Sequence, residues 1–204
     1  MSSNKSLSIS LRDVTKDNIE QLHVLNNTIF PVRYSQKFYN DIVQATQYAP
    51  ITRIPVVSGA TVSQINTNKS LDSIQSTALT HQSMLCRFAY CNDYVIGATA
   101  CKLEYNETTK KYNVYIMILC VLAPYRNQSV GTQLINYILS YCTQNSNHIE
   151  SITAHVQTNN DDAINFYKRH GFTIHDKVVE NYYKRITPSS AYFIKRPIDP
   201  NPNQ

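Results

Sequence analysis

The sequence predicts an α/β fold in which strands and helices share one core, and three observations support this class. Val114 to Leu122 is an apolar and aromatic run without a charge, long enough for a buried strand and far short of the roughly 20 residues that cross a bilayer. Beyond a short polar loop, apolar residues recur at helical spacing at Leu134, Ile135, Ile138, Leu139 and Cys142. With 204 residues and 42% hydrophobic content, the chain can bury one sizeable core, so we expect a single domain.

The N-terminal part predicts one strand and two helices. Apolar residues alternate with polar ones at Leu7, Ile9 and Leu11, which indicates a half-buried strand. A helix that ends before Pro31 is indicated by Ile19, Leu22, Leu25 and Ile29. A second helix, capped by Ser35, carries Phe38, Tyr39, Ile42 and Val43. Phe30 to Tyr34 forms a rigid aromatic turn between the two helices.

The segment 50–83 differs in composition from its surroundings. It is rich in Ser, Thr, Asn, Gln, Pro and Gly and poor in charge, which is typical of a flexible insertion. Structureless loops above about 12 to 15 residues are usually functional or linker-like, so a small folded flap is the alternative.

The C-terminal half predicts further strands and one capped helix. Residues 85–90 and 95–105 form a hairpin around Cys91-Asn92-Asp93, residues 107–111 make the next turn, and residues 151–156 form a strand. Asn160 caps a helix that Gly171 ends, with acidic residues in its first turn and basic residues in its last. Residues 172–179 and 191–195 complete the sheet. The core therefore spans 6–196, and 197–204 is expected to be a disordered tail because it is proline-rich without apolar periodicity.

Charge and cysteine content narrow the class of protein. The net charge of +5 suits an anionic ligand, but no dense Lys/Arg run indicates a nucleic-acid surface. Five cysteines without paired ligand spacing indicate reduced thiols and no metal site. The polar, alternating N-terminus lacks a secretory signal, and no segment suits a membrane, so we expect a cytoplasmic protein.

One stretch suggests an anion site. Pro124 ends the buried strand, Arg126 to Gly131 forms the loop, and a helix begins just beyond it. Free backbone N–H groups and the positive end of the helix dipole would face one point there. The alternative is an ordinary strand-to-helix turn with a surface arginine.

The sequence resembles the Gcn5-related N-acetyltransferase (GNAT) superfamily, whose pyrophosphate loop reads Q/R-x-x-G-x-G/A. Arg126 to Gly131 matches it, with Ser129 in place of the first glycine. Longer matches are IFPVRY at 29–34, YIMILCVLAPYR at 115–126, HVQTNNDDAINFYKRHGF at 155–172 and NYYKRI at 181–186. Together these resemble the NatE-type N-terminal protein acetyltransferases (the N-alpha-acetyltransferase 50 type) over residues 6–48, 85–145 and 150–196. The resemblance implies a GNAT fold: a mixed, mostly antiparallel sheet of about seven strands with a V-shaped splay between strands 4 and 5, flanked by about four helices.

The resemblance also implies acetyl-CoA as the co-substrate. The residues expected to hold it are Leu119, Cys120, Val121, Arg126, Asn127, Gln128, Ser129, Val130, Gly131, Thr132, Asn160 and Tyr167. Leu119 to Val121 would offer free backbone N–H groups to the thioester oxygen. Taken alone, Asn160 could be only a helix cap and Tyr167 only a core aromatic.

The resemblance assigns proton removal from the amine to Tyr115 and His155, on the two strands that splay apart. Histidine suits this role near its ordinary pKa of about 6.5, whereas a tyrosine near 10 needs a shifted pKa or a positioning role. The alternative places Tyr115 in the core and His155 on a carbonyl.

A substrate groove completes the expected site. Phe30, Pro31, Val32, Tyr34 and Met117 would line an apolar pocket for a first side chain such as methionine. Tyr182, Tyr183, Lys184 and Arg185 would close over the peptide backbone; the alternative is an exposed basic loop.

Two classes of function follow. The first is an enzyme that acetylates nascent or free protein N-termini beginning with methionine, together with the catalytic and large auxiliary subunits of NatA and, through them, the ribosome. The second is a catalytically weak interaction subunit, favoured by Ser129 because serine is penalised where glycine is needed. Lysine acetylation is a third possibility, disfavoured by a groove closed by tyrosines.

Overall fold

The computed structural model describes residues 7–48 and 84–199. The segment 50–83, expected to be a flexible insertion, lies outside the described residues, as do residues 200–204 of the expected tail.

The described chain forms seven strands, four α-helices and one short 3-10 helix. In order these are β1 (Ile9–Asp13), α1 (Ile19–Ile29), α2 (Gln36–Tyr48), β2 (Met84–Cys91), β3 (Tyr94–Asn106), β4 (Lys111–Val121), η1 (Ala123–Tyr125), α4 (Val130–Gln144), β5 (Ile149–Gln157), α5 (Asp161–Arg169), β6 (Thr173–Val179) and β7 (Ala191–Pro197). Every strand and helix expected from the sequence is present. The bounds move by a few residues; β1 starts at Ile9, not Leu7, and β4 starts three residues before Val114.

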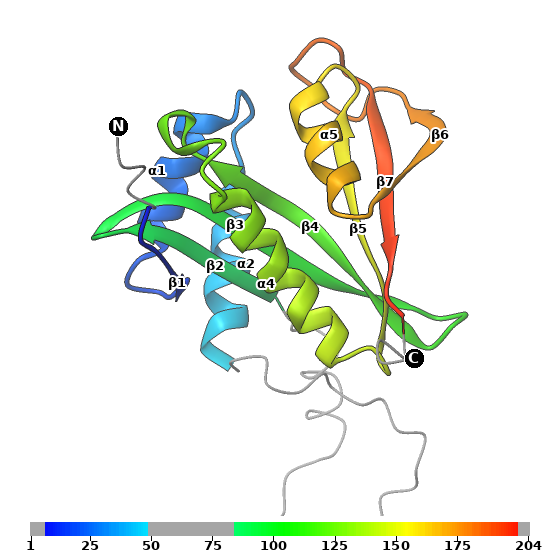
Figure 1. Cartoon of the computed structure of the whole chain (residues 1–204), viewed down its shortest axis with the longest axis horizontal. Coiled ribbons are helices and arrows are strands. Elements are labelled where there is room, and N and C mark those ends of the chain that lie inside the picture. Colours follow the sequence, from blue (N-terminus) through cyan, green and yellow to red (C-terminus); the bar gives the residue numbers. More distant parts are fainter. Residues whose placement is uncertain (1–6, 49–83, 200–204) are drawn as a thin grey trace, which may run out of the picture.

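All seven strands lie in one sheet, ordered β1-β2-β3-β4-β5-β7-β6. Each neighbouring pair is antiparallel except β4 and β5, which are parallel. Figure 1 shows α4 crossing one face of the sheet with α1 and α2 behind it, and α5 in front of β5 and β7.

The parallel pair β4 and β5 separates along its length. The strands pair only from Tyr112 with Ile149 to Tyr115 with Thr153. Beyond these positions β4 continues to Val121 against β3 alone, and β5 continues to Gln157 against β7 alone. The inner edges of the two strands therefore diverge, which confirms the expected V-shaped splay (Figure 1).

An irregularity in β4 decides which side chains face the splay. In the pairing with β3, Ala100 lies opposite Ile118 while the next residue, Cys101, lies opposite Ile116, so Met117 is an extra residue on β4. Such a bulge reverses the side-chain alternation beyond it. Ile116 accordingly packs with α4 and α5, whereas Ile118 packs with α1 and α2.

The helices bury the faces that their sequences predict. On α4, Leu134, Ile135, Ile138 and Cys142 are fully buried against the sheet. On the opposite face, Leu22 and Leu25 of α1 join Tyr39 and Ile42 of α2. Fully burying one such aliphatic side chain stabilises the fold by about 1.5 to 3 kcal/mol, so these two layers hold β2, β3 and β4 between them.

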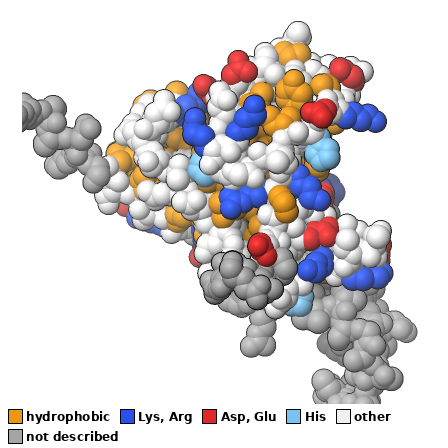
Figure 2. All heavy atoms as spheres, turned by 45° about the vertical axis from the view of Figure 1, so that its right-hand side comes forward, with side chains coloured by type: hydrophobic (Ala, Val, Ile, Leu, Met, Phe, Trp, Pro, Cys, Tyr) orange, Lys and Arg blue, Asp and Glu red, His pale blue; other side chains and the backbone are white. Residues whose placement is uncertain are grey.

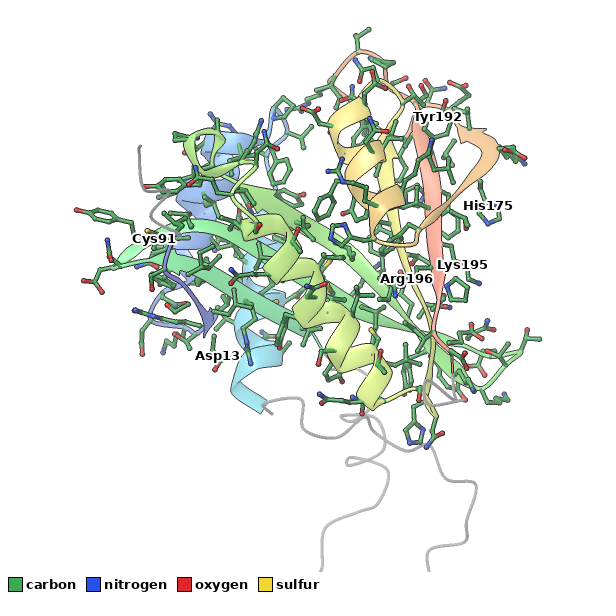
Figure 3. The ribbon with its side chains drawn as sticks, in the orientation of Figure 1. Asp13, Cys91, His175, Tyr192, Lys195 and Arg196 are labelled. Carbon is green, nitrogen blue, oxygen red and sulfur yellow. The ribbon has the colours of Figure 1, made fainter. Side chains whose placement is uncertain are left out.

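The chain end differs from the expected tail. Residues from 197 were predicted to be disordered, but β7 runs to Pro197 and the N–H of Ile198 donates to the carbonyl of Glu150 at 2.9 Å. Proline is tolerated here because it occupies the last position of the strand. On the same strand, Arg196 donates to the carbonyl of His170 and so ties β7 to the end of α5 (Figure 3).

Two further features are the state of the cysteines and the character of the helices. The five cysteines are free, four of them buried and Cys91 partly exposed near the hairpin tip. Across residues 7–48 and 84–199, no helix has the length and apolar character that crossing a membrane requires.

Candidate active site

A cavity of about 1130 Å³ occupies the splay between β4 and β5. Its walls come from the turn after α1, from β4 and β5, from the loop before α4, from α5 and from the loop before β7. Most of the residues predicted from the sequence line it: Phe30, Pro31, Val32, Tyr34, Tyr115, Met117, Leu119, Cys120, Val121, Arg126, Asn127, Ser129, Gly131, Thr132, His155, Asn160, Tyr167, Tyr182 and Tyr183. The fold therefore brings together segments separated by more than a hundred residues.

The loop between β4 and α4 is a tight turn with two left-handed residues. Asn127 has φ of 59° and Ser129, the residue before α4, has φ of 63°. Ser129 makes no capping bond through its side chain, so the first N–H groups of α4 are not capped by it. This arrangement directs N–H groups and the positive end of the helix dipole at the cavity, which suits an anionic group.

Two residues of this loop that were predicted to bind the co-substrate have other side-chain partners and do not line the cavity. The side chain of Val130 is buried in the core below α4. The side-chain amide of Gln128 donates to the carbonyl of Pro124 at 2.8 Å. Neither side chain therefore contributes to the cavity wall.

Gly131 is needed for a close approach. A Cβ atom at this position would lie 3.2 Å from the ring of Phe166 on α5. Its role is therefore to let the start of α4 lie against α5. Arg126, at the other end of the loop, uses its Nε to donate to the carbonyl of Val121 at 3.2 Å, which holds its guanidinium beside the end of β4.

Asn160 and Tyr167 have the structural roles that the sequence offered as alternatives to co-substrate binding. The side-chain oxygen of Asn160 accepts from the N–H of Ala163 at 3.1 Å and caps α5. Tyr167 is only 7% exposed and packs against Phe166 and Phe172. Both residues also line the cavity, which is where a co-substrate contact would require them.

Tyr115, His155 and Tyr182 form a hydrogen-bonded chain across the splay. The hydroxyl of Tyr115 lies 3.1 Å from Nδ1 of His155 and 2.7 Å from the hydroxyl of Tyr182. The ring of Tyr182 also stacks on His155, with centroids 4.3 Å apart and an interplanar angle of 16°. This geometry excludes the alternatives in which Tyr115 is only a core residue and His155 binds only a carbonyl.

The pKa values of His155 and Tyr115 shift in opposite directions, which gives the two residues different roles. Burial lowers the pKa of His155, and the carboxylate of Glu104 opposes part of that effect. Burial, followed by the hydrogen bond with Tyr182, raises the pKa of Tyr115 well above its ordinary range. Near neutral pH, His155 is therefore uncharged and able to accept a proton, whereas Tyr115 keeps its proton and acts as a hydrogen-bonding bridge.

The turn after α1 builds an aromatic pocket beside β4. Tyr34 packs on Phe30 and Phe38, with ring centroids 5.9 and 4.6 Å away, and its hydroxyl donates to the carbonyl of Met117 at 3.2 Å. Burial raises the pKa of Tyr34, so the phenol stays protonated and remains a donor. This bond connects the α1–α2 turn to the bulge in β4.

The loop before β7 agrees with the expectation only in part. Tyr182 and Tyr183 line the cavity, and their rings meet edge to face at 4.8 Å. Burial raises the pKa of Tyr183 to about 12. Lys184 and Arg185 do not line the cavity; Ile186 does. The two basic residues follow Tyr183 on an exposed stretch of loop, as the alternative interpretation expected.

Sequence reasoning missed three lining residues close to His155: Lys102, Glu104 and Phe193. Lys102 and Glu104 are two charges at alternate positions of an otherwise apolar strand, and that alternation was a usable signal for a shared face. Phe193 lies opposite His155 in the pairing of β5 with β7. Within the part of the chain that the structure describes, no group of His, Cys, Asp and Glu could hold a metal ion.

Comparison with protein families agrees with this fold and site. The model of the acetyltransferase (GNAT) family matches residues 61–172. The chain belongs to this family, and the sheet, with its splayed parallel pair, is the GNAT fold predicted from the sequence. The class of protein is therefore an acetyltransferase.

Relatives and solved structures narrow the type. N-alpha-acetyltransferase 50 of Danio rerio is 34% identical over 188 residues, which is 92% of this chain and 88% of that protein. The probable N-acetyltransferase san of Drosophila melanogaster is 35% identical over 93% of this chain and 80% of its own length. Arabidopsis thaliana Naa50, solved in complex with the bisubstrate analogue CoA-Ac-MVNAL, is 36% identical with a TM-score of 0.68, covering 93% of this chain and 99% of that one. The enzyme is thus of the N-alpha-acetyltransferase 50 type.

Proposed function

We propose that this chain is a protein N-alpha-acetyltransferase that moves acetyl from acetyl-CoA to the α-amino group of proteins beginning with Met followed by an apolar or small residue. The observation that carries the proposal is the Tyr115–His155 hydrogen bond at the point where β4 and β5 begin to separate. It places a proton acceptor where the strands leave room for a donor on one side and an amine on the other.

Acetyl-CoA as donor is supported by the loop before α4 and by the relatives. The positive-φ turn and the start of α4 present N–H groups suited to a pyrophosphate. The Arabidopsis Naa50 structure contains a CoA-based analogue. In this chain, the unpaired inner edge of β4 beyond Tyr115 is the place for the thioester, and Leu119 to Val121 line it.

The proton step uses the states already described. An α-amine has a pKa of about 7.7 to 8.0 and must lose its proton before it attacks. Neutral His155 accepts that proton, directly or through the hydroxyl of Tyr115, while the amine nitrogen bonds to the thioester carbon. The carbon–sulfur bond then breaks, and the thiolate of CoA leaves and takes up a proton. General-base assistance of this kind contributes about 10² to 10⁴ in rate.

Methionine as the first residue is supported by the pocket around Tyr34. Phe30, Pro31, Val32 and Met117 offer apolar surface to a long, unbranched side chain. A shorter side chain loses about 0.8 kcal/mol for each missing buried methylene. The analogue bound to Arabidopsis Naa50 carries the peptide letters MVNAL, which begin with methionine.

A chain end, in preference to an internal lysine, is supported by the tyrosines on both sides of the cavity. Tyr34 comes from one wall, and Tyr182 and Tyr183 from the other. A lysine side chain must bring polypeptide from two directions past them. The test compares a Met-Leu peptide with an N-terminally blocked copy carrying one internal lysine. We expect acetylation of the first, and preference for the second would replace this proposal by lysine acetylation.

A second candidate function rests on one observation, the left-handed conformation of Ser129 at the phosphate loop. Serine there carries strain of about 1 to 2 kcal/mol that glycine would not, which favours a weakly active auxiliary subunit. Calorimetry of the natural protein with acetyl-CoA distinguishes the two. Binding with measurable turnover supports the enzyme, whereas binding that appears only in Ser129→Gly supports the auxiliary subunit.

The proposal includes cytoplasmic, co-translational work beside the catalytic and large auxiliary subunits of NatA, close to the ribosome. It is supported by the kinship with N-alpha-acetyltransferase 50 and by the free thiols. Co-purification of the tagged chain with those subunits and with ribosomes is the direct test. A chain recovered from cells without either would leave it an independent acetyltransferase.

A further inference from the structure

We propose that the Lys102–Glu104 ion pair on β3 sets the pH range in which His155 can accept a proton, and that its two charges act on His155 in opposite directions. Nζ of Lys102 lies 2.7 Å from Oε1 of Glu104, and both side chains line the cavity. The inference rests on the proposed role of His155 as proton acceptor, and it assigns a positioning role to two residues that touch no reacting atom.

The pair lies directly beside the hydrogen-bonded chain. Lys102 is opposite Tyr115 in the pairing of β3 with β4, and its ammonium lies 5.0 Å from the centre of the Tyr115 ring. Tyr115 in turn bonds to His155. A cation over an aromatic face is attracted to it, so Glu104 and the Tyr115 ring together fix where the Lys102 charge stands.

The surroundings of His155 contain few other charges. Tyr115 of β4 and Tyr182 of the loop before β7 contact the ring, and Phe193 of β7 packs at 5.3 Å. His175 of β6 lies beyond Phe193, 5.3 Å from it, and Figure 3 shows it on the outer side of β7. Lys195 follows two residues along β7, opposite Thr153. Glu104 is the charged group whose field opposes the burial of His155.

The opposite charges of Lys102 and Glu104 act against each other at His155. A carboxylate near an imidazole stabilises its protonated form, and an ammonium destabilises it. Paired at 2.7 Å, the ammonium of Lys102 weakens the field that the carboxylate of Glu104 exerts on its surroundings. The field of Glu104 then raises the pKa of His155 by less than burial lowers it. Removing either charge leaves the other without a compensating partner. Loss of Glu104 leaves a cation near His155, and loss of Lys102 leaves an anion.

The two halves of the pair therefore give opposite predictions. In Glu104→Gln, protonation of His155 should move to lower pH, so the acidic limb of kcat/KM moves to lower pH as well. In Lys102→Met, both should move to higher pH. The double variant should lie between the two single variants. A purely structural role would lower activity in each variant without moving the limbs in opposite directions.

The turn between β3 and β4 supplies a matched control. Glu107 and Lys110 form an ion pair at 3.1 Å, and both side chains are exposed. Glu107→Gln and Lys110→Met remove the same charges away from the cavity, and neither should move the profile. Glu104→Asp retains the charge and should stay close to the natural protein, which checks for effects of side-chain shape alone.

The deciding measurement is the NMR titration of the His155 ring in the acetyl-CoA-free full-length chain, assigned with His155→Gln. It needs no turnover, so it stands even if the chain proves to be a weak enzyme. Opposite shifts in Glu104→Gln and Lys102→Met, reduced in high salt because both side chains are partly exposed, support the inference. Shifts of the same sign, or none, overturn it.

Discussion

Tyr115 and His155 are hydrogen-bonded at 3.1 Å although they stand on strands whose pairing ends at Tyr115. The side chains thus bridge a gap that the backbones leave open. This bridge joins the two halves of the sheet at the proposed site, because the proposed proton acceptor belongs to β5 and the proposed donor-binding edge to β4.

Removing either the Tyr115 hydroxyl or the His155 ring should slow the same chemical step. Tyr115→Phe and His155→Ala are each expected to lower kcat by about 10² or more, because general-base catalysis is worth about 10² to 10⁴. The double variant should be little worse than either single one, since both act through one hydrogen bond. Steady-state kinetics measure this, with calorimetry showing unchanged acetyl-CoA affinity. A comparable loss of that affinity would make the two residues structural.

The pH profile should reflect a histidine that is hard to protonate. Burial lowers the pKa of His155, so kcat/KM should hold as pH falls through about 6.5, the ordinary histidine value, and decline only below it. The contribution of His155 to the free energy of unfolding depends on pH in the same direction. As pH falls below 6.5 the unfolded chain takes up a proton before the folded one, so the His155 contribution is present above 6.5 and is lost on acidification. Thermal unfolding of His155→Gln against the natural chain isolates the contribution: the difference in Tm should be constant above neutral pH and should shift against the natural chain as pH falls below about 6.5.

Glycine at position 129 should improve both stability and donor binding. Ser129 has φ of 63°, and the left-handed conformation costs a non-glycine residue about 1 to 2 kcal/mol. After the greater freedom of glycine in the unfolded chain is subtracted, Ser129→Gly should gain about 1 kcal/mol, or about 2 to 4 °C in Tm. Acetyl-CoA affinity should rise by up to about tenfold, to the extent that donor binding holds the loop more firmly in this strained conformation. Ser129→Ala, which keeps the strain, should gain neither.

The phenol of Tyr34 should matter for the peptide and not for the donor. Tyr34→Phe removes its bond to the carbonyl of Met117 and leaves a part-buried acceptor unpaired, a loss of about 1 kcal/mol. We expect a several-fold higher KM for a Met-Leu peptide with acetyl-CoA affinity unchanged. Tyr94→Phe provides the control, because Tyr94 is 75% exposed at the start of β3. Equal effects of both variants on KM would contradict the pocket assignment.

The sequence predicted the strands and helices well because their apolar periodicity is strong. The α4 positions were recognisable from spacing alone, and the residues that begin and end α5 carry the expected capping chemistry. The proposal of Tyr115 and His155 as a catalytic pair came from resemblance, since a tyrosine and a histidine 40 residues apart show no local pattern.

The features that the sequence did not predict depend on how neighbouring strands and loops are aligned. Lys102 and Glu104 reach the cavity only because β3 pairs with β4 in one particular alignment. The bulge at Met117 carries no glycine or proline to mark it, yet it decides which residues of β4 face α1 and α2. Lys184 and Arg185 were placed beside the peptide, but the loop turns them away and presents Ile186.

Surface charge, by contrast, agrees with the mild net charge of +5. Figure 2 shows Lys and Arg side chains interspersed with Asp and Glu over the visible face, without one continuous basic field. On this face the chain therefore does not present the dense positive charge that a phosphate backbone selects for.

The short pairing between β4 and β5 also leaves only a narrow connection between the two halves of the sheet. The half-sheet β1-β2-β3-β4 and the half-sheet β5-β7-β6 meet over a few residues at one end, so a small rotation there becomes a larger displacement at the open end. At that pivot the hydroxyl of Ser151 donates to the side chain of Asn113, one residue on each arm. A side-chain bond between two residues that do not line the cavity therefore helps to fix the angle between the half-sheet that carries Tyr115 and the half-sheet that carries His155.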